Sequence, residues 1–83
     1  MIVTKGTRII CPNGHICGCV TRDVGEDSAI QSGDLRIMGG TDATREGHVG
    51  HVCAKDGCGM VIAEAREGRF RIRTVSGWVG RLE

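Results

Sequence analysis

The chain has 83 residues, which is near the lower limit at which burial of apolar surface alone stabilises a domain. Its 11 basic and 10 acidic residues give a formal net charge of +1, which does not indicate an indiscriminate nucleic-acid binder. Phe70 and Trp78 are the only aromatic residues, and 14 residues are glycine. We therefore predict one domain, spanning residues 1–83, with a thin core that needs a stabilising element such as a metal ion or disulfides.

The first half of the chain predicts short strands separated by turns and loops. Residues 7–10 are expected to form a strand that enters a turn, because Pro12 fixes φ and Asn13-Gly14 is a favourable turn pair. Residues 16–21 form a second β-like run. Residues 23–33 are polar and rich in Gly, Asp and Ser, which predicts a loop before a short strand at 35–38.

The second half contains the clearest hairpin of the sequence. Residues 41–50 show no sustained apolar period and are predicted to be a loop, with room for a single helical turn at 42–45. Residues 60–65 and 69–75 then form two strands joined by a turn at 66–68.

Side chains alternate along the second strand of this hairpin. Phe70, Ile72 and Thr74 are expected on one face, and Arg69, Arg71 and Arg73 on the other. Residues 78–83 are predicted to be a short tail. No helix of three turns is evident, so the predicted fold class is small β.

Cellular compartment and cysteine number favour a metal site over disulfides. No segment approaches the roughly 20 apolar residues of a membrane span. Residues 1–6 lack the apolar run of a secretory signal, which predicts cytoplasmic synthesis. Five cysteines would leave one thiol unpaired in a complete disulfide framework. In a reducing compartment, clustered Cys and His residues indicate metal binding.

Two local pairs of ligand-type residues are spaced as in a structural zinc site. Cys11 and His15 have three residues between them, and Cys53 and Cys58 have four, with Gly57 inside the turn. A closed zinc site takes four ligands, usually from two such pairs. We therefore predict that Zn²⁺ binds Cys11, His15, Cys53 and Cys58. The ion would join two turns that are distant in sequence, so that metal-binding energy becomes folding energy.

Four other residues compete for this assignment. Cys17 and Cys19 would share one face of an extended strand, where they could join the site or act as small buried apolar residues. His48 and His51 lie in a glycine-rich approach to the second pair, where solvated loop histidines are the alternative. The commonest knuckle has a cysteine three positions after the first, and Gly14 occupies that position here.

The two turns and the strand that follows the second one resemble a zinc ribbon. Residues 11–15 resemble the first knuckle of that family, and residues 53–59 with the strand at 60–65 resemble the second. Small ribbons of this kind, including Com-like ones, occur in phages and prophages. The resemblance covers residues 7–21 and 51–75.

This resemblance implies two zinc knuckles on β-hairpins, a small antiparallel sheet and long loops. The chain departs from the ribbon pattern in its wider second knuckle, in the histidine of its first, and in a long insertion between them. Ribbons serve as nucleic-acid binders, as subunits of larger machines and as structural modules, so the fold does not decide the function.

Catalysis is not expected from this sequence. A closed four-ligand site leaves no open metal position, and the chain has neither a His-Glu helix motif nor a phosphate-binding glycine loop. We predict a non-catalytic structural subunit, or a cementing or adaptor protein, in a homo- or hetero-oligomeric protein assembly. The ribbon resemblance suggests a phage particle, in which the chain would be part of a virion.

Two sequence features bear on the partner. The apolar ends, Ile2-Val3 and Trp78-Val79 with Leu82, are candidates for contact with another subunit. The alternative function is a nucleic-acid-binding regulator in which Arg69, Arg71 and Arg73 contact phosphates, with Arg66 and Arg81 nearby and Trp78 stacking on bases. Charges on an outer strand face can also simply keep a sheet edge soluble.

Overall fold

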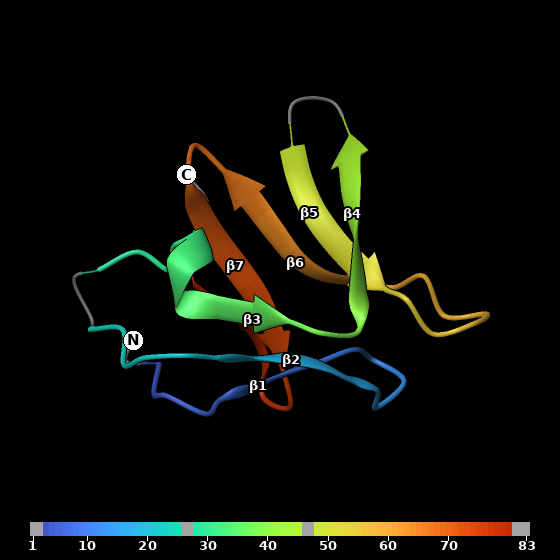
Figure 1. Ribbon diagram of the computed structural model, residues 1–83, viewed down its shortest axis with the longest axis horizontal. Helices are drawn as coiled ribbons and strands as arrows, with labels where there is room; N and C mark the ends of the chain where they lie inside the picture. The colour runs from blue at the N-terminus through green and yellow to red at the C-terminus, as the bar shows by residue number, and fades with distance from the viewer. Residues whose placement is uncertain (1–2, 26–27, 46–47, 81–83) are drawn as a thin grey trace.

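In the computed structural model the chain forms two antiparallel β-sheets and one short 3₁₀ helix, counted over residues 3–25, 28–45 and 48–80, which the structure describes. For residues 43–45, 48 and 49 it describes the backbone only. The smaller sheet has the order β1-β2-β3, and the larger runs from β4 to β8 with each strand paired to the next (Figure 1). The predicted small β class is therefore confirmed.

The strands of the smaller sheet are β1 (Arg8–Ile10), β2 (Ile16–Val20) and β3 (Leu35–Ile37). The strands of the larger sheet are β4 (Gly40–Arg45), β5 (His48–Cys53), β6 (Val61–Arg66), β7 (Arg69–Thr74) and β8 (Gly77–Val79). The 3₁₀ helix η1 covers Ser32–Asp34.

The prediction of a loop at residues 41–50, with a helical turn at 42–45, was wrong. These residues lie in a hairpin, because β4 and β5 pair along their whole length, from Gly40 opposite Cys53 to Arg45 opposite His48. β5 also pairs with β6 on its other side. Backbone ladders on both sides hold β5 in the sheet without an apolar side-chain period, which is why the sequence pattern failed to show it.

The predicted tail was also partly wrong, because Gly77–Val79 form β8 and Trp78 lies opposite Arg73 on β7. Two of the apolar residues near the chain ends make contacts within the chain. Val3 is buried and forms a bridge with Val24, and Val79 packs against the core. Val3 is therefore engaged within the chain, whereas Trp78 and Val79 remain partly exposed, and Ile2 and Leu82 lie outside the described residues.

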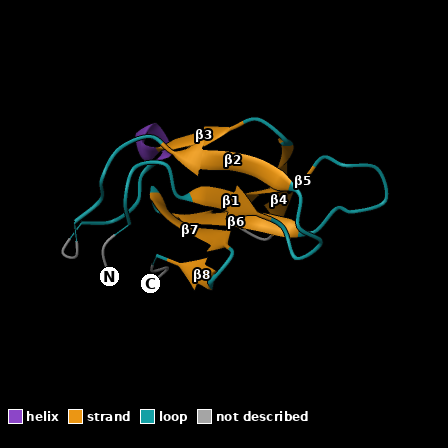
Figure 2. Cartoon of the chain, turned by 90° about the horizontal axis from the view of Figure 1, so that it is seen from below, coloured by secondary structure: helices purple, strands orange, loops and turns teal. Residues whose placement is uncertain are grey.

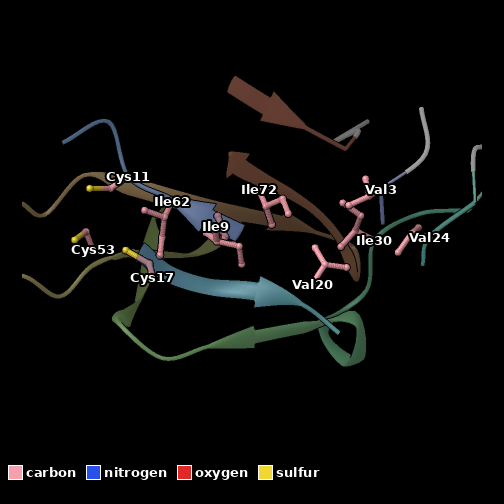
Figure 3. Close-up of a cluster of buried hydrophobic side chains, with 11 residues drawn as sticks. Val3, Ile9, Cys11, Cys17, Val20, Val24, Ile30, Cys53, Ile62 and Ile72 are labelled. Atoms are coloured by element: carbon pink, nitrogen blue, oxygen red, sulfur yellow. The ribbon is translucent and has the colours of Figure 1, made fainter. Parts of the chain in front are cut away.

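The two sheets face each other across one core. Figure 2 shows β2 and β3 as a layer apart from β6, β7 and β8. Ile9 from β1, Ile62 from β6 and Ile72 from β7 are completely buried between the layers. Figure 3 shows Cys11, Cys17 and Cys53 at one end of this core, with Val3, Val24 and Ile30 at the other. The core therefore continues directly into the cysteine-rich turns.

β7 has the two faces that its sequence predicts. Ile72 and Thr74 are buried and Phe70 is partly buried, whereas Arg69 is exposed and Arg71 and Arg73 are partly exposed. The alternation of the strand therefore places the three arginines on the side of the larger sheet that faces away from the core.

The connection between β2 and β3 is anchored by a buried carboxylate. Asp34 is fully buried, accepts a hydrogen bond from the backbone N–H of Gln31 (2.9 Å) and pairs with the guanidinium of Arg22. Burial raises the pKa of the Asp34 carboxyl, but the Gln31 hydrogen bond and Arg22 lower it more, so its pKa lies below the usual value.

Candidate metal centre

The first knuckle is the tight turn between β1 and β2. The backbone N–H of Cys11 donates to the carbonyl of His15 (3.0 Å), and that of Gly14 donates back to the carbonyl of Cys11 (2.9 Å). Gly14 has φ of 86°, a left-handed conformation that favours glycine. The backbone N–H of His15 points at the Cys11 sulfur, 3.3 Å away. The turn therefore sets both side chains on its concave side and supplies a hydrogen-bond donor to one sulfur.

The second knuckle connects β5 to β6. Cys53 is the last residue of β5, and its N–H donates to the carbonyl of Met60 (2.8 Å), which closes the loop. Within the loop, the N–H of Cys58 donates to the carbonyl of Lys55 (3.0 Å). Gly57 and Gly59 both have positive φ, 77° and 61°. The second knuckle has four residues between its two ligands, one more than the first. Gly57 between the cysteines and Gly59 after them take the left-handed conformation that this longer turn uses.

The four residues predicted from spacing lie together in space. One ligand atom from each of Cys11, His15, Cys53 and Cys58 lies within 4.8 Å of all the others. The Sγ atoms of Cys11 and Cys58 are 3.7 Å apart, and His15 Nδ1 lies 3.3 Å from Cys11 Sγ and 3.5 Å from Cys53 Sγ. The two knuckles thus converge at one end of the sandwich, on the right in Figure 1.

These separations can be compared with a tetrahedral zinc site. Zn–S bonds of about 2.3 Å and a Zn–N bond of about 2.0 Å require S···S separations of about 3.8 Å and S···N separations of about 3.5 Å. The observed distances agree with these values within a few tenths of an ångström. The four side chains could therefore hold one metal ion, with His15 binding through Nδ1.

Asn13 is a residue of this site that the sequence reasoning treated only as part of a turn. Its side-chain amide nitrogen lies 3.2 Å from the Cys58 sulfur, so the first knuckle donates a hydrogen bond to a ligand of the second. The cross-connection helps orient Cys58, as outer hydrogen bonds do around metal ligands. No local sequence signal distinguishes this role from that of an ordinary Asn-Gly turn, because Cys58 is 45 positions away.

The thiols differ in their readiness to ionise. The backbone N–H of Met60 and the Asn13 amide lower the pKa of Cys58 to about 6, against the opposing effect of burial. The backbone N–H of Lys55 also lowers the pKa of Cys53, but burial and the neighbouring thiols outweigh it and raise that pKa to about 12. A metal ion therefore competes less with a proton at Cys58 than at Cys53.

Of the competing residues, Cys17, Cys19 and His51 have described side chains, and none of these three is grouped with the four. Cys17 is buried beside the site, where its Sγ approaches the carbonyl of His15 (3.5 Å) and burial raises the pKa of its thiol. Cys19 lies opposite Arg8 on β1 and is partly exposed. His51 places Nδ1 3.2 Å from a carboxylate oxygen of Asp42. His48 begins β5, and its side chain lies outside the described part of the chain.

The second predicted group of residues lies on the outer face of the larger sheet. Arg71 donates from Nη2 to Glu64 Oε1 (3.0 Å), and its guanidinium carbon is 4.5 Å from the centre of the Trp78 ring. The guanidinium carbon of Arg73 is 5.5 Å from the same ring. Arg69 is exposed, and Arg81 lies outside the described residues.

Comparison with known proteins finds no relative of the chain. No family model matches the chain, and neither a curated protein nor a solved structure matches it. The zinc-ribbon resemblance therefore remains a hypothesis based on the knuckle residues. In the part of the chain that the structure describes, no helix is long and apolar enough to cross a membrane.

Proposed function

We propose that the chain is a non-catalytic β module stabilised by one Zn²⁺ ion, bound by Cys11, His15, Cys53 and Cys58. The observation that supports this most directly is the geometry of the ligand atoms: all four lie within 4.8 Å of one another, and three of their six separations agree with edges of a zinc tetrahedron. Three thiolates and one imidazole are the donor set of a closed structural site. With four protein ligands there is no open position for a reacting water, so the proposed role of the metal is to stabilise the fold.

The position of the knuckles explains what the metal would stabilise. Cys11 and His15 flank the turn of the smaller sheet, whereas Cys53 ends β5 of the larger sheet and Cys58 lies in the loop between β5 and β6. One ion bound to all four side chains would therefore join the two layers at one end of the core. The hydrophobic core between the layers is built mostly from aliphatic residues, so a fixed connection at its end has a large relative effect.

We further propose that this rigid module works as a small subunit or adaptor in a larger protein assembly. Several large apolar side chains are exposed, among them Met38 (65%), Ile16 (54%) and Val75 (86%). Exposed apolar side chains of this size are often buried in protein–protein interfaces. The resemblance to phage-encoded ribbons suggests a phage particle as the setting of this assembly.

Metal analysis with native mass spectrometry tests the proposed site. The purified reduced protein should contain one zinc ion per chain, and Cys53→Ser should lose it, whereas Cys19→Ser should retain it. Substitution with Co²⁺ should give the absorption bands of a tetrahedral thiolate site in the wild type. A chain that takes up no metal under reducing conditions would contradict the proposal.

Light scattering on the metal-loaded protein tests the assembly role. We expect the wild type to have a mass above that of one chain. The Met38→Lys variant, which places a charge at one of the exposed apolar positions, should have a mass closer to that of one chain. A wild-type chain that stays at the mass of one copy over the accessible concentration range would contradict self-assembly.

A further inference from the structure

A second feature of the molecule is unrelated to the metal site. It is the outer face of β6, β7 and β8, which we call the arginine face and define by Arg66, Arg69, Arg71, Arg73 and Trp78. We propose that the arginine face binds single-stranded nucleic acid, with exposed arginines on its phosphates and a base stacked at the Arg71–Trp78 pair. This proposal goes beyond the structural role of the metal.

The strand register places these side chains together. Arg66 lies opposite Arg69, Glu64 opposite Arg71, and Arg73 opposite Trp78. Opposite residues of an antiparallel pair project to the same side of the sheet. The intervening positions, such as Ile72, are buried in the core, so the arginine face points to solvent.

The arginine face is strongly cationic, although the chain as a whole is close to neutral. Among the described residues, four guanidinium groups share this surface with one carboxylate, Glu64, and Glu67 lies in the turn at its end. The net charge of the whole chain is +1. Arg66 and Arg69 lie directly opposite each other, an arrangement of like charges that destabilises an isolated sheet. A bound polyanion would reverse that cost, because each arginine would gain a phosphate partner.

Arg71 is fixed in a position that suits base stacking. Its ion pair with Glu64 holds the guanidinium over the Trp78 ring, 4.5 Å from the ring centre. Its Nε is buried and has no hydrogen-bond partner among the described residues. Guanidinium planes and aromatic rings are the two surfaces on which unpaired bases stack in protein complexes. The pair is therefore arranged in advance for a flat ligand.

The chemistry favours a single strand over the other polyanions. An acidic peptide offers carboxylates for the arginines but no flat ring for the Arg71–Trp78 pair. A duplex hides its base faces, so it offers no unpaired base to the Arg71–Trp78 pair. Along β7, Arg69 and Arg73 are four residues apart, about 13 Å, and lie on either side of the Arg71–Trp78 pair. A single strand with a base stacked at this pair would therefore bring phosphates on both sides of that base towards the two arginines.

The expected strength follows from the number of free arginines. Arg66 and Arg69 are exposed and Arg73 is partly exposed, so three phosphate contacts are available. Three contacts to a single strand predict a slope of about −2 for log K against log salt concentration. By the same relation, each phosphate contact raises the affinity about fivefold when the salt concentration falls from 1 M to 0.1 M. The loss of two contacts therefore lowers the affinity at 0.1 M salt about 25-fold.

Trp78 provides a specific readout, because it is the only tryptophan and the chain has no tyrosine. We would titrate the metal-loaded protein with a short oligothymidylate and follow tryptophan emission between 50 and 200 mM salt, a range in which phosphate contacts weaken strongly. Base stacking should quench the emission in a saturable way. Arg69→Ala with Arg73→Ala should lower the affinity about 25-fold and flatten the salt dependence.

The matched control is Arg8→Ala with Arg36→Ala, which removes the same charge from the opposite side of the sandwich. Both arginines are exposed and lie on either side of Cys19, across the smaller sheet. This control should change the affinity by less than about threefold, since it removes no phosphate contact on the arginine face. Circular dichroism and zinc content should show that both double variants remain folded.

Three outcomes would overturn the proposal. The first is the absence of saturable quenching by the oligonucleotide at 50 mM salt. The second is an equal loss of affinity in both double variants, which would indicate attraction by net charge alone. The third is tighter binding of polyglutamate than of the oligonucleotide, with the same dependence on Arg69 and Arg73, which would assign the face to an acidic protein.

Discussion

Removal of the metal should destabilise the fold by an amount that can be derived from the positions of the ligands. His15 and Cys53, whose ligand atoms are 3.5 Å apart, are 38 positions apart in the chain. Treated as a cross-link that closes a loop of this length, the metal removes chain entropy from the unfolded state worth about 4 kcal/mol at 25 °C. Domains gain about 0.05–0.15 kcal/mol per residue, so the whole chain is stable by about 4–12 kcal/mol.

Loss of the ion therefore costs a third or more of the free energy of unfolding. For a domain of this size, 1 kcal/mol corresponds to about 4–8 °C in Tm, so removal of the metal should lower Tm by about 15–30 °C. The aliphatic core around Ile9, Ile62 and Ile72 does not depend on the metal, so part of the β structure should survive below the lowered Tm.

Thermal unfolding followed by circular dichroism, with and without a chelator, measures this shift. A phosphine reductant must be present, because the free thiols of Cys11 and Cys58, whose sulfurs are 3.7 Å apart, would otherwise form a disulfide that masks the loss of the metal. Adding back zinc should restore the original Tm. If metal analysis shows that the ion has been removed and Tm moves by less than about 5 °C, the cross-link does not stabilise the fold and the reasoning from loop closure is wrong.

Three further predictions concern the sheets and the β2–β3 connection, each measured by urea unfolding. Asp34→Ala should cost about 2 kcal/mol, since it removes a buried, hydrogen-bonded carboxylate. Because folding lowers the pKa of this carboxyl, its contribution is present above the ordinary value of 3.8 and disappears as pH falls through the folded pKa, so the variant should lose less stability in acid than the wild type. Gly18→Ala should cost about 1–3 kcal/mol, since a Cβ there would overlap a carbonyl oxygen of β3, whereas Gly33→Ala meets no atom within 4 Å and should be nearly neutral. Ile72→Ala should cost about 2–5 kcal/mol, and Val75→Ala, at an 86% exposed position, about 0.5 kcal/mol or less. Equal effects within either matched pair would contradict the assigned packing.

Much of the candidate site could be predicted because its information is local. Each knuckle is a turn of a few residues in which ligand spacing, Pro12 and the glycines act together, and Asn13-Gly14 marks a turn with no knowledge of the fold. The same holds for β7, whose alternation between Ile72 and Arg71 states which side faces the core. The two faces of a strand and the conformation of a single turn are determined by residues that are neighbours in the sequence.

The remaining features depend on which segments meet, and that is decided by packing over long separations. The hairpin of β4 and β5 exists because β6 offers a partner for β5, although its own sequence resembles a loop. Asn13 acts on Cys58 only because the two sheets bring their turns to one end of the core. Cys17, only two residues from His15, is held in the core by the same packing. The sequence by itself therefore determined the two knuckle turns, the strands β1, β2, β3, β6 and β7, and the ligand types. Only the tertiary structure decided which thiols converge, because strand pairing and burial depend on residues that are far apart in the chain.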